Sequence, residues 1–569
     1  MSENVREMAH ELVMRAPSDV MRLDRLGSFH QTRLSFMRGL LRRVTSEGWE
    51  FSRPIWRVDH QGVGVAVYEA KGPTRSYSLV CFAHDLDPKN RTDRSIATQW
   101  DATFTLFDGV PSQEDLDRLS HQVPIQEAGR VTRSELSLSR ANRSVRLFEH
   151  VVSRLAKGVQ PDTEQIEDIG YLMRTTAVYG SGKFGAAALD TLKSRSETSR
   201  PFQVEMLSVY LTRAFTIDIV EHLAKSRAPK TAVSLDRRIA RRLGVGNSTG
   251  LGMAPFLVNH PRLVHNWINA RETALARVRA QDSATGETIA LFHASLNAAS
   301  ISIAKWRTAD QGQAARIVSL RNDISTLQNY LKSNTLTSNF PWEQLFQWGM
   351  TNLQTEAQEL LVSLLIEPHG DLVDDLLDTM SADQSCPLKV DGAMQISKLR
   401  DLLQTRYDWV ERFDFDKTEA RQNFWYVSEN KGEPRLSPRS IDPDADFFET
   451  PLDIACQIAR LKVDLAAWSN DELLASFLLA HPEHRKIVRR VQGLADCEYS
   501  EIQENIVADG IRPIDMLRCK LSFFGATDFD PRSDRWVRIT MFKNAPYPDE
   551  LSPMTQDNWV YAADAVTSD

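Results

Sequence analysis

The sequence predicts a mainly α-helical protein, with a large helical-bundle core, a small N-terminal α+β module containing an antiparallel hairpin, and a short mixed strand region near the C-terminus. Apolar residues recur at helical spacing over most of residues 141–380, for example in residues 202–226. Strand patterns occur in residues 50–106 and again after Met516. At 569 residues the chain is too long for one compact core, so we expect several lobes.

The N-terminal α+β module is expected to span residues 1–140. Residues 1–46 read as helical, and residues 50–106 then alternate between apolar and polar side chains and are rich in Val, Tyr and Phe. Lys71-Gly72-Pro73 separates two of these alternating runs, which is the pattern of an antiparallel hairpin.

Two further domains follow. We expect a central helical domain with glycine-rich loops over residues 141–380 and an acidic, mostly helical lobe over residues 393–569. A polar, proline-containing break at residues 380–392 marks the start of this last lobe. A second such break at residues 427–450 indicates a long loop inside the lobe. From Met516 onward the pattern is that of strands, including residues 517–529.

Composition indicates an ordinary globular protein. Its 42% hydrophobic and 25% charged residues argue against disorder. No run approaches the roughly 18 apolar residues of a membrane span, and the start lacks the pattern of a secretory signal, so we expect a cytoplasmic protein that does not enter membranes. The middle third is basic and the last third acidic, which is compatible with packing between lobes or between subunits of a homo-oligomer.

The cysteines show no metal-binding or disulfide pattern. They are odd in number and no two form a CxxC pair, so we expect scattered reduced thiols; they are Cys81, Cys386, Cys456, Cys497 and Cys519. His84, Asp85 and Asp87 follow a predicted strand, but turn chemistry explains them better than a metal. We therefore predict no metal site, and we find no nucleotide motif that would name a cofactor.

The glycine-rich stretch at 244–252 is the main candidate binding site. Glycines allow successive amides to point inward around an anion, and a helix that begins next offers its free N–H groups. We interpret the stretch as a loop that binds a carboxylate or phosphate. The predicted contact residues are Gly246, Asn247, Ser248, Thr249 and Gly250.

A second glycine segment contains Tyr179, Lys183 and, just upstream, Arg174. It lacks the first glycine and the Ser or Thr of a phosphate-binding P-loop, so we reject that interpretation. A lysine between glycines is still suited to meet an anion as a point charge. We predict that both glycine segments line one cleft, with Lys183 and Tyr179 as catalytic residues and Arg174 as a binding residue.

His260 and Arg435 complete the predicted site. His260 follows the glycine stretch closely and is the preferred general acid or base, ahead of His265. Its surroundings, residues 256–261, resemble residues 477–482, and both fit a helix that ends before a proline opening the next one. Arg435 lies near two aromatic residues in a polar loop and could clamp a substrate carboxylate.

These features lead to three functional hypotheses. The first is an enzyme acting on a small anionic metabolite, with proton-transfer chemistry of the lyase or isomerase type, because such chemistry needs only an anion clamp and positioned acid and base groups. The second is a non-catalytic helical scaffold or regulator whose glycine loops are packing turns. The third is nucleic-acid binding through the basic middle, which the overall charge of −8 makes the least favoured.

Overall fold

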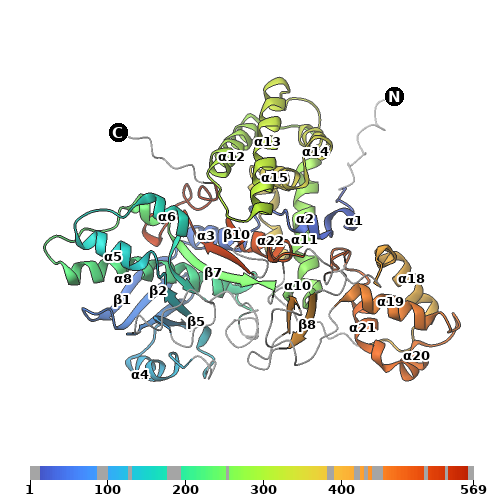
Figure 1. Cartoon of the computed structure of the whole chain (residues 1–569), viewed down its shortest axis with the longest axis horizontal. Helices are drawn as coiled ribbons and strands as arrows, with labels where there is room; N and C mark the ends of the chain where they lie inside the picture. Colours follow the sequence, from blue (N-terminus) through green and yellow to red (C-terminus); the bar gives the residue numbers. More distant parts are fainter. Residues whose placement is uncertain are drawn as a thin grey trace.

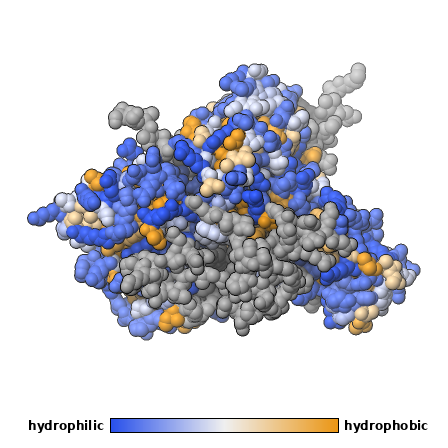
Figure 2. All heavy atoms as spheres, viewed as in Figure 1, coloured by the Kyte–Doolittle hydropathy of each residue, from blue (hydrophilic) through white to orange (hydrophobic). Residues whose placement is uncertain are grey.

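The computed structural model gives the fold of most of the chain. It describes residues 13–85, 100–125, 131–175, 192, 194–251, 255–380, 390–415, 423–427, 434–438, 453–504, 506, 511–531 and 536–561. None of the described helices is both long enough and apolar enough to cross a membrane. Figure 2 shows hydrophilic residues over most of the coloured surface of one face, with hydrophobic residues in small groups among them.

A mixed sheet of nine strands joins distant parts of the described chain (Figure 1). Neighbouring strands are antiparallel except β6 and β7, which are parallel. The order across the sheet is β1 (Glu50–Val58), β2 (Gly64–Lys71), β3 (Ser76–Ala83), β4 (Ala102–Asp108), β5 (Glu135–Arg143), β6 (Tyr171–Thr175), β7 (Gly244–Gly250), β11 (Trp536–Met541) and β10 (Asp528–Pro531).

The prediction of a helical bundle with minor strands is therefore wrong. The expected hairpin at Lys71-Gly72-Pro73 is present as β2 and β3, but it belongs to a sheet of nine described strands. Strand β7 replaces the loop that the sequence predicts, because glycines and small polar residues are poor strand formers and give no strand pattern. Its backbone nevertheless pairs with β6 on one side and β11 on the other, and such long-range pairing has no local sequence signal.

Helices pack against the sheet, and apolar side chains from the helices and the strands form a common core. The long helix α8 (Gln203–Arg227) packs on strands β3 to β7, and its Phe215 meets Phe104 and Tyr68 edge-on. Other helices of this part are α1 (Pro17–Val20), α2 (Leu23–Leu26), α3 (Phe36–Ser46), α4 (Gln113–Gln122), α5 (Phe148–Ala156), α6 (Thr163–Ile169) and α9 (Arg237–Arg241).

Two helical groups extend from the sheet (Figure 1). One contains α10 (Pro255–Asn259), α11 (Pro261–Arg279), α12 (Gly286–Ala304), α13 (Gln311–Ser333), α14 (Pro341–Asn352), α15 (Thr355–Ile366), α16 (Gly370–Val373) and α17 (Leu376–Thr379). The other, which we call the C-terminal lobe, has its own apolar core and contains α18 (Ile396–Arg406), α19 (Ile454–Leu465), α20 (Leu474–Ala480) and α21 (Arg485–Gly493). A short hairpin, β8 (Asn423–Val427) and β9 (Pro434–Pro438), lies against α10.

Helix α22 (Pro513–Phe524) occupies the centre of the molecule, and it corrects a second prediction. Residues 517–529 were expected to form a strand, but 517–524 are helical. Every residue of α22 is buried, so its polar residues do not mark an exposed helical face, and residues 517–524 alternate in the manner of a strand instead. The prediction of a terminal strand is correct only for β10 and β11.

A buried cluster of charges ties the N-terminal segment to the helices. Glu359 on α15 is fully buried and accepts hydrogen bonds from Arg15 at 2.6 Å, Arg25 at 2.7 Å and Arg271 at 2.7 Å. Burial alone would raise the pKa of Glu359, but the three arginines outweigh it and hold that pKa well below its usual range. The stabilisation is present above pH ~4.5 and is lost as the pH falls and the carboxylate takes up a proton.

Replacing Glu359 with Ala should lower the free energy of unfolding by about 3–5 kcal/mol, because three arginines lose a shared carboxylate inside the protein. Among the described contacts, only Arg15 and Arg271 keep another carboxylate, that of Glu272. Urea unfolding at pH 7 measures the effect. Glu149→Ala is the matched control, since its pair with Arg227 is exposed and should contribute less than about 1 kcal/mol. Equal losses in the two variants would contradict a stabilising role of the buried cluster.

Replacing Gly246 with Ala should destabilise the sheet by about 1–3 kcal/mol, because the added Cβ would lie 2.6 Å from Cγ of Tyr171. The control is Gly286→Ala, where an added Cβ meets no atom within 4 Å. The thermal unfolding midpoint of each variant measures the difference, and a midpoint unchanged by Gly246→Ala would show that this contact relaxes freely.

Candidate active site around Lys520

The candidate site lies where the two parallel strands β6 and β7 end. Parallel neighbours have their carboxyl ends at the same edge of a sheet, so Thr175 and Gly250 mark one end of the pair. In open sheets with parallel strands, ligands commonly bind outside these ends. Figure 1 shows the arrow of β7 ending beside α10, with α11 and β8 close by.

The predicted residues of the glycine stretch form strand β7. Alternation along the strand and pairing with β11 place Asn247 and Thr249 on the face that carries Val537 and Ile539, which α22 covers. Gly246, Ser248 and Gly250 point to the other face by the same alternation. The stretch is thus a strand with two faces; its role in anion binding stays a prediction.

Arg174 is brought next to this strand. It lies in β6, and its backbone position is opposite Gly246 of β7. The predicted partners Tyr179 and Lys183 lie outside the described residues, so the predicted shared cleft stays a prediction. Of Arg435, the structure describes the backbone, which pairs with Tyr426 in the β8–β9 hairpin.

His260 lies in the turn between α10 and α11, at the N-cap position of α11. Its Nδ1 donates to the carbonyl oxygen of Phe256 at 2.8 Å, and the two rings lie 4.5 Å apart. The tautomer that this bond selects has its acid–base nitrogen at Nε2. His265 instead accepts a bond from the Tyr499 N–H and stacks on the Tyr499 ring, and burial lowers the pKa of His265. His265 is therefore a structural residue.

Lys520 on α22 is a candidate functional residue that sequence analysis missed. Its side chain is 6% exposed, and its Nζ lies 3.8 Å from the centre of the Phe256 ring and 5.2 Å from that of Phe524. Within the described part of the chain, no hydrogen bond or ion pair engages this amine. A buried lysine normally has a carboxylate partner, so this arrangement is unusual.

Burial lowers the pKa of Lys520 from 10.5 to about 7. At neutral pH the amine is therefore part neutral and part charged, which suits it to take up and release protons or to attack a carbonyl carbon. The face of the Phe256 ring favours the charged form but supplies no proton acceptor.

The other cation of α22 has the opposite environment. Arg518 is fully buried, yet it donates to the carbonyl of Phe29 at 2.9 Å and to Glu356, whose pKa it helps to lower to about 2. Because Arg518 and Lys520 are two residues apart, they point to different sides of the helix. Arg518 thus belongs to the structural charge cluster, and Lys520 faces α10.

A cavity of about 280 Å³ opens near the N-terminus of α22, lined in part by Asp310, Arg316, Arg512 and Asp515. Its charges pair with one another: Arg316 bonds Asp515 at 2.9 Å, and Arg512 lies 3.2 Å from Asp310. These pairs leave less charge for a ligand than the solitary amine of Lys520, which makes Lys520 the stronger candidate.

Two features explain why sequence analysis missed Lys520. Residues 517–524 alternate in the manner of a strand, and a lysine on a strand would be expected to face water. The sequence signal for a buried lysine is that Lys520 lies among large apolar residues, which are Leu517, Leu521, Phe523 and Phe524. That signal becomes specific when the helix is known to be buried on all sides.

Comparison with known proteins gave no further information, because no protein-family model, curated protein or solved structure matches this chain. Function has to be inferred from the chemistry of the site.

Replacing Lys520 with Met should stabilise the protein at pH 6, because folding no longer requires the burial of an unpaired ammonium group. In the wild type, Lys520 loses its proton near pH 7 in the folded state and near pH 10.5 in the unfolded state. The free energy of unfolding of the wild type therefore rises between these pH values by about 1.4 kcal/mol per pH unit. The difference in stability between Lys520→Met and the wild type should therefore decrease as the pH rises through this range. Unfolding midpoints at pH 6 and pH 9.5 measure it, and a difference independent of pH would contradict the lowered pKa of Lys520.

Proposed function

We propose that this chain is an enzyme that moves a proton on a small anionic metabolite, in a lyase or isomerase type of reaction, with the amine of Lys520 as the base. The observation that carries the proposal is the burial of this amine, without a described partner, beside the carboxyl ends of two parallel strands. A base with a pKa near the working pH transfers protons most effectively, and burial brings the pKa of Lys520 to about 7.

Neighbouring residues supply the other roles. Asn247 and Thr249 lie on the sheet face under α22 and offer hydrogen bonds to the polar atoms of a substrate. Lys183 is proposed as the positive charge that holds the substrate carboxylate or phosphate. His260, which contacts the same Phe256 ring as Lys520, is proposed as a second acid–base group.

The leading alternative is a non-catalytic scaffold or regulator. The tight contact between Gly246 and the Tyr171 ring favours it, because this glycine then serves close packing and not a ligand. The two functions make different predictions about Lys520: a structural lysine stays closed to small molecules, whereas a catalytic lysine must be reachable by the substrate.

Reductive trapping distinguishes the two functions. With glyoxylate, a small anionic aldehyde, and cyanoborohydride at pH 7, Lys520 should be modified faster than exposed lysines such as Lys157. Roughly half of the Lys520 amines are neutral at that pH, whereas fewer than about one in a thousand amines of an ordinary lysine are. Peptide mass spectrometry locates the adduct.

The controls are Lys520→Arg, which should abolish the fast adduct, and Lys157→Arg, which should leave it unchanged. Modification of exposed lysines with Lys520 untouched would defeat the enzyme proposal and favour the scaffold.

A further inference from the structure

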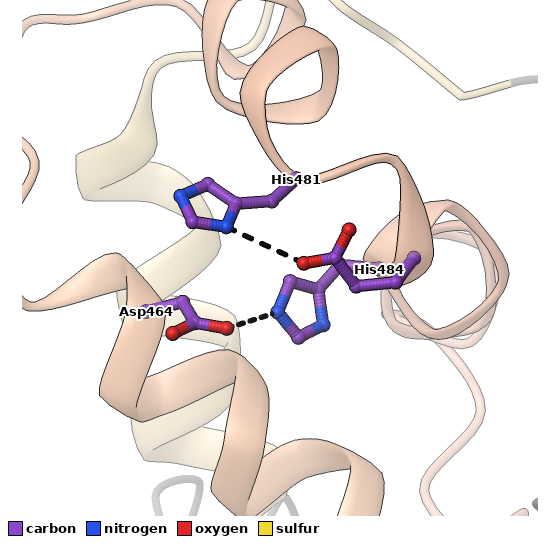
Figure 3. A group of neighbouring side chains, drawn as sticks. Asp464, His481 and His484 are labelled. Carbon is purple, nitrogen blue, oxygen red and sulfur yellow. Dashed lines mark hydrogen bonds and ion pairs between the residues drawn. The ribbon is translucent and has the colours of Figure 1, made fainter.

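A group of metal-ligating side chains lies in the C-terminal lobe, away from Lys520. Asp464 is near the end of α19, and His481, Glu483 and His484 lie in the turn between α20 and α21. One ligand atom from each of these four residues lies within 4.8 Å of the others. Figure 3 shows Asp464, His481 and His484 converging from two separate parts of the lobe.

The four side chains are already paired. His484 Nε2 lies 2.7 Å from an oxygen of Asp464, and His481 Nδ1 lies 3.4 Å from an oxygen of Glu483. Ligand atoms around tetrahedral zinc lie about 2.0–2.2 Å from the ion, and hence about 3.3–3.6 Å from one another. The ion would replace the protons that these pairs now share, and the ligand atoms, which lie within 4.8 Å of one another, would move closer together around it.

Aromatic packing holds both imidazoles. The ring of Phe477 stacks on His481 at 4.9 Å and on His484 at 5.7 Å. The His484 side chain is 7% exposed, whereas that of Glu483 is 60% exposed. Three ligands are thus positioned by the fold, and the fourth lies at the surface, where an ion can enter.

The other turn of this kind in the chain provides an internal comparison. Phe256, His260 and Pro261 repeat the arrangement of Phe477, His481 and Pro482, with the same bond from the His N–H to the Phe carbonyl. There the proline is followed by Arg262 and Leu263, which are not metal ligands. The contact between the phenylalanine and histidine rings therefore serves the turn, and the carboxylates and second histidine of the C-terminal lobe are additional.

We propose that Asp464, His481, Glu483 and His484 bind one divalent transition-metal ion, zinc by preference. Two imidazole nitrogens and two carboxylate oxygens match the ligand types of zinc, and the two carboxylates balance its charge. The ion links the end of α19 to the turn before α21, so it stabilises the C-terminal lobe. This inference is independent of the function proposed for Lys520.

The test is a titration of the full chain, stripped with EDTA, with zinc chloride in a calorimeter. Wild type should bind one ion per chain, and cobalt in place of zinc should give the visible absorption of a tetrahedral site. The double variant His481→Gln, Asp464→Asn should bind more than about 100-fold more weakly, since loss of outer-shell partners alone weakens binding about 10- to 100-fold. His60→Ala, at an exposed histidine outside the group, is the matched control and should bind as wild type does.

Zinc should also raise the thermal unfolding midpoint of wild type, and EDTA should reverse the increase. The single variant His481→Gln serves if the double variant unfolds, because that side chain is partly exposed and its loss leaves the His484–Asp464 pair intact. Absence of a stoichiometric site in wild type, or unchanged affinity in His481→Gln and the double variant, would overturn the proposal.

Discussion

The backbone pairing of strand β7 is the constraint on which the rest of the structure depends. It joins β6, and through it the N-terminal hairpins, to the C-terminal strands β11 and β10. Small residues make this possible, because an added Cβ at Gly244 would lie 2.2 Å from the carbonyl oxygen of Met541. The same glycines that suggest an anion loop in the sequence allow two strands to approach closely in the fold.

Helix α22 packs against this central part of the sheet and must bury its charged residues there. The interaction partners of Arg518 and Lys520 differ. Arg518 has a carboxylate and a carbonyl as partners, so its charge is stabilised inside the protein. Lys520 has an aromatic ring and no described carboxylate, and its lowered pKa follows from that difference. A stable fold does not require such a residue, which is why we propose a functional role for Lys520.

The C-terminal lobe stands apart in both packing and chemistry. Its apolar core, formed by residues such as Ile396, Leu399, Ile458 and Phe477, is separate from that of the sheet. A small core buries little apolar surface, so a metal ion that links two of its helices would contribute a large share of its stability. The metal site and the Lys520 site would then have different roles in one chain.

The sequence by itself determined the elements whose signals are local: the hairpin at Lys71-Gly72-Pro73, the long helix α8, and the turn at His260 and Pro261. Hydrophobic period, caps and prolines report on neighbours in the chain, and these predictions are confirmed. The tertiary structure alone decided that 244–250 is a strand and that α22 is a buried helix. Pairing with distant strands and burial on all sides erase the local pattern, so Lys520 and the group around His484 became visible only when the packing was known.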